Sequence, residues 1–250
     1  MSATITDFNG LAAALGRKVV LSMSVPDLAW LADGLLEAAS ADEAQGVIQH
    51  VHVVADGLEL VAEATDRYRI HQMRVTLREH VERVEAVISR DVLVWAKRNA
   101  RTFKPKRDAM IDPVAQLVLE IEPGTAEAGE MPAGWSAAVY REWDAEDAPA
   151  ARFDAPLVKD AFPDVEGLIE SARRGDAAAP APLALAFLDG AQTLQTPFTQ
   201  VPVIQFTATR NERAWAHGPA LLDFWERDGV LRATAMIQPS KSVTDEETAR

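Results

Sequence analysis

Hydrophobic and polar side chains alternate along residues 50–77, which is the clearest strand pattern in the chain. The alternation is interrupted twice, by Asp56-Gly57 and by Thr65-Asp66. An Asp-Gly pair favours a tight hairpin turn because glycine tolerates positive φ. Thr and Asp favour turns because their side chains form hydrogen bonds to nearby backbone groups. The segment therefore predicts three consecutive strands separated by two turns.

Three other segments have the apolar spacing of amphipathic helices. The first follows Ser24, a residue type that caps helix N-termini, and ends near Ser40. The second follows Ser89 and runs to about Thr102, and the third, with a weaker stripe, covers 183–194. Alternation or short apolar runs predict further strands at 19–23, 86–88 (after a charged connection at 79–83), 114–121, 136–143, 152–158, 201–207, 212–217 and 230–237.

The order of elements is a strand, a helix and several strands, and this order is then repeated. Short hairpins between the strands favour an α+β fold with antiparallel sheets. An Ala/Pro-rich run without periodicity predicts a linker. The predicted organisation is an N-terminal leader (1–17), a domain of two halves (18–170), the linker (171–182), a half-domain (183–243) and a disordered tail (244–250). The leader is either a short helix over 1–16 or a loosely attached segment.

Composition narrows the class of protein. The 250 residues are 48% hydrophobic, which is enough for a sizeable core. The absence of cysteine excludes disulfides, cysteine-ligated metals and thiol nucleophiles. No apolar run reaches the length of a membrane span and no signal-peptide pattern is present, so we expect a soluble cytoplasmic protein. The net charge of −13 argues against non-specific coating of nucleic acid. A protein with this net charge can still carry a local basic surface that contacts DNA.

Three short motifs, in the same order along the chain, resemble the bacterial DNA polymerase sliding clamp, the β clamp family. DGLELVAEATDRYRI at 56–70 is similar to a strand and Thr-Asp-x-x-Arg segment of the clamp's middle domain. Phe162-Pro163-Asp164 resembles the junction between the middle and last domains, and MIQPSK at 236–241 resembles the closing segment. The resemblance covers about 19–243. It implies an α+β, DNA-clamp-like fold of repeated helix-plus-antiparallel-sheet halves.

The resemblance also implies a function. A clamp has three domains of two halves each, whereas this chain has room for three halves, which suggests a shortened accessory or phage-type member of the family. We expect a non-enzymatic processivity factor for DNA replication, similar to the DNA polymerase III β subunit. It would encircle or contact duplex DNA without sequence preference, act as a homo-oligomer at the nucleoid, and bind polymerase or other replication proteins through short linear motifs.

The alternative is a protein that forms no ring and captures clamp-binding motifs as a decoy or regulator of replication. An enzyme is not expected, because no Walker loop, Gly-x-Gly-x-x-Gly, Gly-x-Ser-x-Gly or His-Glu-x-x-His motif is present. No cofactor is expected either.

In the clamp family, partners insert a linear motif into an apolar cleft between the middle and last domains. The resemblance assigns this peptide-binding pocket to Val47, Thr65, Arg67, Tyr68, Arg69, Ile70, Pro163, Leu168, Met236 and Gln238. Apolar walls suit the anchors of an extended peptide, and a donor such as Arg69 suits its backbone. Arg67 and Tyr68 are bulkier than is common in the family, Gly167 replaces a basic residue and Gln238 an apolar one. These residues alternatively do no more than cover a domain junction.

A second candidate surface is basic. Six cations lie on and after the second predicted helix: Lys97, Arg98, Arg101, Lys104, Lys106 and Arg107. In the family such side chains contact DNA phosphates without reading bases. The alternative is a solvated helix face, with cations near a helix C-terminus. The first predicted helix carries no Lys or Arg between 25 and 40, and 183–194 carries none, so a uniformly positive DNA-facing surface is not expected.

Three histidines raise the question of a metal site. His50 and His52 share a strand face, and His71 is on a neighbouring predicted strand. Imidazoles so placed bind zinc when further ligands complete the site. The spacing offers no fourth ligand, so we interpret them as partly exposed strand histidines and expect no metal.

Overall fold

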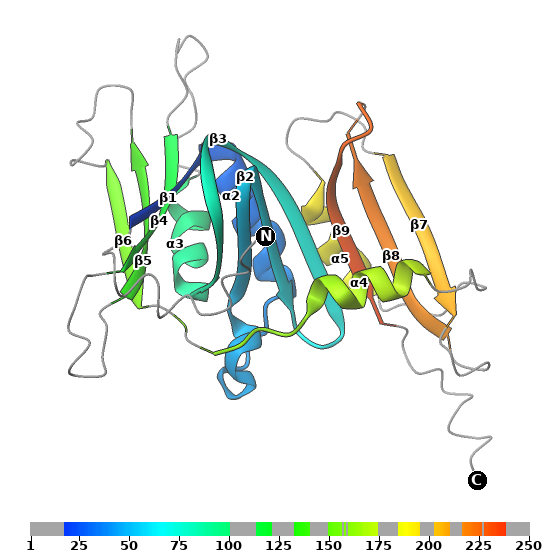
Figure 1. The fold of residues 1–250 in the computed structure, drawn as a ribbon. Helices are drawn as coiled ribbons and strands as arrows, with labels where there is room; N and C mark the ends of the chain where they lie inside the picture. The colour runs from blue at the N-terminus through cyan, green and yellow to red at the C-terminus, as the bar shows by residue number, and fades with distance from the viewer. Residues whose placement is uncertain are drawn as a thin grey trace, which may run out of the picture. The chain divides into compact units, whose positions relative to one another are not determined.

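The computed structural model describes residues 18–100, 114–121, 133–140, 150–156, 158, 160–174, 185–195, 203–210, 217–226 and 228–238 (Figure 1). The expected N-terminal helix and disordered tail lie outside these residues. The chain divides into two compact units. Unit 1 draws on 1–32, 50–61 and 75–160, and unit 2 on 33–49, 62–74 and 161–250. The predicted division at the linker stays a prediction.

Unit 1 contains a four-stranded antiparallel sheet in the order β1-β4-β5-β6. Its strands are β1 (Lys18–Ser24), β4 (Val114–Ile121), β5 (Ala133–Tyr140) and β6 (Ala151–Pro156). The helix α3 (Arg90–Ala100) packs on β5 and β6, where the rings of Trp95 and Phe153 stack with centroids 6.2 Å apart. The predicted repeat of a strand, a helix and further strands is present in part: the strand expected at 86–88 before the second helix is the end of the long strand that precedes α3, and β1 pairs with β4.

Both predicted serine caps are confirmed. The helix α2 (Val25–Ala38) follows Ser24, whose hydroxyl oxygen accepts a hydrogen bond from the Asp27 N–H at 3.1 Å. Ser89 accepts one from the Asp91 N–H at 3.3 Å at the start of α3. Each cap satisfies a backbone donor that the first helical turn leaves unpaired.

The two long strands β2 (Val51–Thr65) and β3 (Arg69–Ile88) contribute residues to both units. Their course corrects two predictions. Asp56-Gly57 forms no hairpin: β2 runs straight through it, with Gly57 at φ 63°, a conformation that a bulge uses as readily as a turn. The residues 79–83 form no connection either, since they are an exposed charged stretch inside β3. Only the second predicted turn, after Thr65, is present.

Unit 2 is built around the sheet ordered β2-β3-β9-β8-β7. Its further elements are a 3-10 helix η1 (Glu43–Gln49), α4 (Val165–Arg174), α5 (Leu185–Ala191), η3 (Gln192–Leu194), β7 (Val203–Arg210), β8 (His217–Trp225) and β9 (Leu231–Ile237). The pairs β3–β9, β9–β8 and β8–β7 are antiparallel. In Figure 1, α4 lies across the faces of β9 and β8. The α+β fold class with antiparallel sheets is confirmed.

Two elements of unit 2 were not predicted correctly. The strand β8 runs from His217 to Trp225 and was not expected, whereas the strand predicted at 212–217 lies outside the described residues except for His217. The helix α4 was not expected, and its last turn occupies the first four residues of the predicted linker. Its signal, apolar residues at the helical spacing 165, 169 and 172, is short and interrupted by a glycine.

Within unit 2, α2 approaches β3 closely at Gly34. A Cβ added to Gly34 would lie 2.5 Å from the Met73 Sδ and 3.0 Å from the Leu194 Cδ2. The Gly34 carbonyl accepts a hydrogen bond of 2.7 Å from the buried His71 ring. Among the described helices, none combines the length and apolarity that a membrane crossing requires.

Candidate functional site

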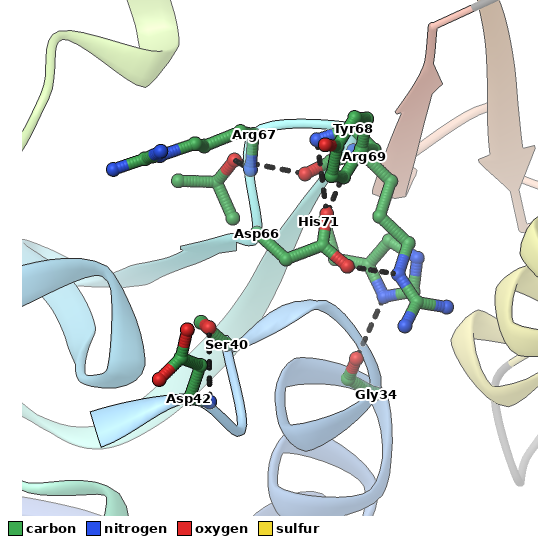
Figure 2. A network of polar contacts seen from close by, with 9 residues as sticks. Gly34, Ser40, Asp42, Asp66, Arg67, Tyr68, Arg69 and His71 are labelled. Atoms are coloured by element: carbon green, nitrogen blue, oxygen red, sulfur yellow. Dashed lines mark hydrogen bonds and ion pairs between the residues drawn. The ribbon is translucent and has the colours of Figure 1, made fainter. Parts of the chain in front are cut away.

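The turn between β2 and β3 is held by its own side chains (Figure 2). The Thr65 hydroxyl donates to the Arg69 carbonyl at 2.9 Å, and its oxygen accepts from the Arg67 N–H at 3.2 Å. The Asp66 carboxylate accepts from the Tyr68 and Arg69 N–H groups, each at 3.0 Å. Within these bonds Arg67 adopts φ 79°, a conformation that is uncommon for a non-glycine residue. Local chemistry thus sets the conformation of the turn.

Beyond the turn, strand alternation sends neighbouring side chains to opposite faces of the sheet. Ile70 is paired across the strands with Met236, and Met236 with Leu221, so these three side chains form one apolar row. The row belongs to a buried cluster that α4 covers. The cluster consists of Ile70, Val165, Ile169, Ala172, Leu221 and Met236, with the half-buried Phe162 packed against it.

Arg69 lies on the other face of the sheet. Its Nε is 3.0 Å from an Asp66 carboxylate oxygen, and its guanidinium carbon is 5.1 Å from the ring centroid of Phe187 on α5. Gly190 accommodates this arrangement, since a Cβ there would lie 2.6 Å from the Arg69 Nη1. The guanidinium therefore has an ion-pair partner and a cation–π partner within unit 2.

Tyr68 is the most exposed large apolar or aromatic side chain among the described residues, at 62%. Its ring stacks on Phe187 with centroids 6.4 Å apart and an interplanar angle of 19°. Its carbonyl accepts a hydrogen bond of 2.8 Å from the Gln238 N–H, which extends the β3–β9 pairing by one bond. The backbone of Tyr68 is thereby fixed while one side of its ring remains available to a ligand.

The helix α4 presents one exposed leucine beside the buried cluster. Asp164 caps the helix, because its side chain accepts a hydrogen bond of 2.9 Å from the Gly167 N–H. Val165 and Ile169 face the sheet, whereas Leu168 is 51% exposed. An exposed leucine on a helix that is already packed on a sheet leaves apolar area open to a partner.

The structure brings together only part of the predicted pocket. Ile70 and Met236 lie together in the cluster that α4 covers. Leu168 is on α4, and the exposed Pro163 lies just before this helix. The Tyr68 carbonyl accepts a backbone hydrogen bond from Gln238. Thr65 is buried in the turn and Arg67 is exposed at its tip. Arg69 faces α5, and Val47 is half-buried in η1.

Sequence reasoning missed Val165, Ile169 and Phe187. The helical spacing of the first two was a usable signal, but nothing in the sequence marks Phe187.

The basic surface is only partly described. Lys97 and Arg98 occupy the last turn of α3, half-buried and exposed respectively, where cations interact favourably with the helix dipole. Arg101, Lys104, Lys106 and Arg107 lie outside the described residues. A role in DNA contact stays a prediction for all six.

The three histidines have separate surroundings. The His50 Nδ1 accepts a hydrogen bond of 3.3 Å from the Arg90 N–H, and burial lowers the pKa of this imidazole. The His52 Nε2 is 3.2 Å from a Glu85 carboxylate oxygen. His71 is fully buried in unit 2, and burial lowers its pKa to about 4. No group of three or more potential metal ligands is present in the described part of the chain.

Comparison with known proteins places this fold. No family model matches the sequence, and no curated protein matches it. Solved structures do match. The DNA polymerase III β subunit of Pseudomonas aeruginosa superposes with a TM-score of 0.56 at 11% identity, over 90% of this chain and 67% of the clamp. The β subunit of Thermotoga maritima gives 0.51 at 8%, over 96% and 70%. The β chain of Streptococcus pneumoniae gives 0.50 at 14%, over 91% and 66%.

The fold is therefore that of the sliding clamps. At these identities the similarity is one of fold. The chain spans about two thirds of the length of the clamps it matches, 66% in the pneumococcal case.

Proposed function

We propose that this protein is a clamp-like processivity factor of DNA replication, which binds a short linear motif of a DNA polymerase on unit 2 and associates with duplex DNA. The observation that carries the proposal is the match of about nine tenths of the chain to DNA polymerase III β subunits. Proteins of this fold act by binding and topology, so no catalytic residue is assigned.

The arrangement of unit 2 supports the motif-binding part. Leu168 exposes its side chain on α4, the helix that covers the buried Ile70–Met236 row. An exposed apolar side chain beside such a row suits an apolar anchor of a short extended peptide. Tyr68 exposes its ring separately, at the turn, where it stacks on Phe187 of α5. Because Arg69 is engaged by Asp66 and Phe187, we expect apolar contacts rather than this guanidinium to dominate affinity.

The motif-binding part is tested with a fluorescent peptide that carries the clamp-binding motif of a bacterial replicative polymerase. Leu168→Asp should weaken binding at least about tenfold, because a charge replaces an apolar anchor that binding desolvates. Leu58→Asp is the matched control, since Leu58 is 50% exposed against 51% for Leu168 and belongs to unit 1. Fluorescence anisotropy measures both variants. Equal affinities would contradict the assignment of the site.

The DNA part is tested by retention on nicked circular DNA before and after the circle is linearised. A protein that encircles DNA remains on the circle and leaves the linear form by sliding off its ends. Contact through phosphates alone gives equal retention that falls steeply with salt. Light scattering on the same sample measures whether the chain forms the homo-oligomer that encirclement requires. A monomer with equal retention on both DNAs would overturn the encircling role.

A second candidate function, capture of clamp-binding motifs by a protein that forms no ring, is favoured by one specific observation. The helix α2 contains no Lys or Arg and carries the acidic Asp27 in its first turn. The last turn of α5 has no basic residue either. Helices of this charge interact poorly with phosphates. A monomer that binds the peptide and shows no DNA retention would support this function over the first.

A further inference from the structure

The exposure of Leu168 runs against the hydrophobic pattern of α4. Val165, Leu168, Ile169 and Ala172 have the i, i+3, i+4, i+7 spacing of a complete apolar stripe. A helix that packs only through this stripe would bury all four side chains. In the structure, three are buried and Leu168 is 51% exposed. The helix is therefore rotated away from the orientation that its apolar residues alone favour.

A polar row on the same face of the sheet accounts for the rotation. This row lies two positions along each strand from the apolar row of Ile70, Met236 and Leu221. It consists of Gln72, which is paired with Thr234, and of Asp223, which is paired with the same threonine. All three are buried, at 2%, 1% and 9% exposure. The Gln72 amide continues the row by donating to the Glu63 carboxylate at 2.7 Å. Polar groups so deeply buried must be paired to be tolerated.

Arg173 of α4 provides the pairing at one end of this row. Its Nη2 donates to the Asp223 Oδ1 at 2.8 Å and to the Thr234 Oγ1 at 2.9 Å. The Thr234 hydroxyl in turn donates to the same Asp223 oxygen at 2.6 Å. The three side chains form a closed network between α4, β8 and β9, which we call the Arg173 anchor.

The anchor and Leu168 compete for the orientation of the helix. At about 100° per residue, Leu168 lies about 60° to one side of Val165, and Arg173 about 80° to the other. Turning the helix to bury Leu168 would lift Arg173 away from Asp223. That would leave the buried Asp223 carboxylate without its ion-pair partner, with the Thr234 hydroxyl as its remaining donor in the network, which costs more than the burial of half a leucine side chain regains.

We propose that the Arg173 anchor is a positioning device that holds α4 rotated and so keeps Leu168 exposed as a ligand anchor. The ligand part of this inference rests on the proposed function, because it takes the occupant to be an apolar linear motif. The rotation itself does not depend on any ligand. Arg173 acts through Leu168 and is a positioning residue rather than a contact.

The test uses the absence of cysteine from the chain. Leu168→Cys introduces a single thiol, called here the α4 thiol, whose rate of reaction with 5,5′-dithiobis(2-nitrobenzoate) reports its exposure. The anchor is removed by combining Arg173→Met with Asp223→Asn, which avoids leaving a buried charge. The rate of the α4 thiol should then fall about tenfold, since a buried thiol is shielded from the reagent. Arg173→Lys, which keeps the charge, should retain most of the rate.

Leu58→Cys provides the control thiol, with 50% exposure of the native side chain in unit 1, and its rate should be the same in every background. An unchanged or faster rate of the α4 thiol in the folded double variant would overturn the positioning role. If the anchor only stabilised α4, its removal would loosen the helix and would not bury the thiol. Should the double variant fail to fold, Thr234→Val decides the question. It removes the hydroxyl that accepts from Arg173 and donates to Asp223, and a slower reaction of the α4 thiol supports the proposal while an unchanged rate refutes it.

A separate measurement distinguishes this inference from the proposed function. Proteins that retain Leu168 are titrated with the polymerase-motif peptide. Weaker binding in the double variant, together with the slower α4 thiol, supports both. If the wild-type protein binds no peptide and the α4 thiol still reacts more slowly in the double variant, the anchor is supported and the proposed ligand is rejected.

Discussion

The buried His71 makes the stability of unit 2 sensitive to acid. Its Nδ1–H donates to the Gly34 carbonyl at 2.7 Å, and its Nε2 has no hydrogen-bond partner among the described residues. The neutral Nδ1–H tautomer satisfies the one available acceptor. Protonation would add a buried N–H donor and a charge with no acceptor to receive them.

The magnitude follows from the pKa. Burial is the main cause that lowers it from 6.5 to about 4, and the nearby Arg69 acts in the same direction. Because the folded-state pKa lies below the unfolded one, the unfolded chain takes up the proton first as the pH falls. The contribution of neutral His71 is therefore complete above pH 6.5 and is lost between pH 6.5 and about 4. At about 1.4 kcal/mol per pH unit, the loss amounts to about 3 kcal/mol.

Urea unfolding followed by tryptophan fluorescence, at pH values from about 7.5 to 4, measures this loss. His71→Gln is the comparison, since an amide donates to the Gly34 carbonyl and does not titrate. Other groups, His50 included, titrate in both proteins and cancel in the difference. The wild type should lose about 3 kcal/mol more than the variant between pH 6.5 and about 4. Parallel pH profiles, or an NMR titration of His71 with a midpoint at the ordinary value of 6.5, would refute the reasoning.

Three further substitutions probe the local geometry by urea unfolding at neutral pH. Gly34→Ala should destabilise by about 1–3 kcal/mol despite its better helix propensity, because the new methyl group meets the buried Met73 Sδ at 2.5 Å; a gain in stability would show that Met73 moves aside freely. Asp164→Ala removes the α4 cap to Gly167 and should cost about 1 kcal/mol, with no change contradicting the cap. Gly57→Ala should cost about 1–2 kcal/mol through φ 63° alone, since its Cβ meets nothing closer than 3.7 Å; an alanine of equal stability would argue against that backbone conformation.

Elements whose causes are local could be predicted from the sequence. The caps at Ser24 and Ser89 and the turn at Thr65-Asp66 depend on bonds between residues no more than four positions apart. The strand at 114–121 is observed with the predicted bounds, because its alternation persists over the whole segment. The fold class followed from the order of such elements.

The candidate site could be predicted less completely. The motif resemblance assigned Ile70, Met236 and Leu168 to the candidate pocket, but a linear sequence does not state which face of the sheet Arg69 shares with α5. It also gives no sign that Phe187 lies against Tyr68, because the two are 119 positions apart along the chain. Such contacts depend on the pairing of β3 with β9 and on where α5 packs.

Local sequence accounts for the alternation of β2 and β3, the first helix and the turn between the two strands, since each is favoured by side chains acting on their own backbone. Other features depend on contacts between distant parts of the chain. Gly57 suits a turn or a bulge equally, and long-range pairing selected the continuous strand. The apolar stripe of α4 favours one rotation, and Asp223 and Thr234, brought beneath Arg173 from far along the chain, impose another. Burial makes their pairing obligatory, which no local pattern encodes.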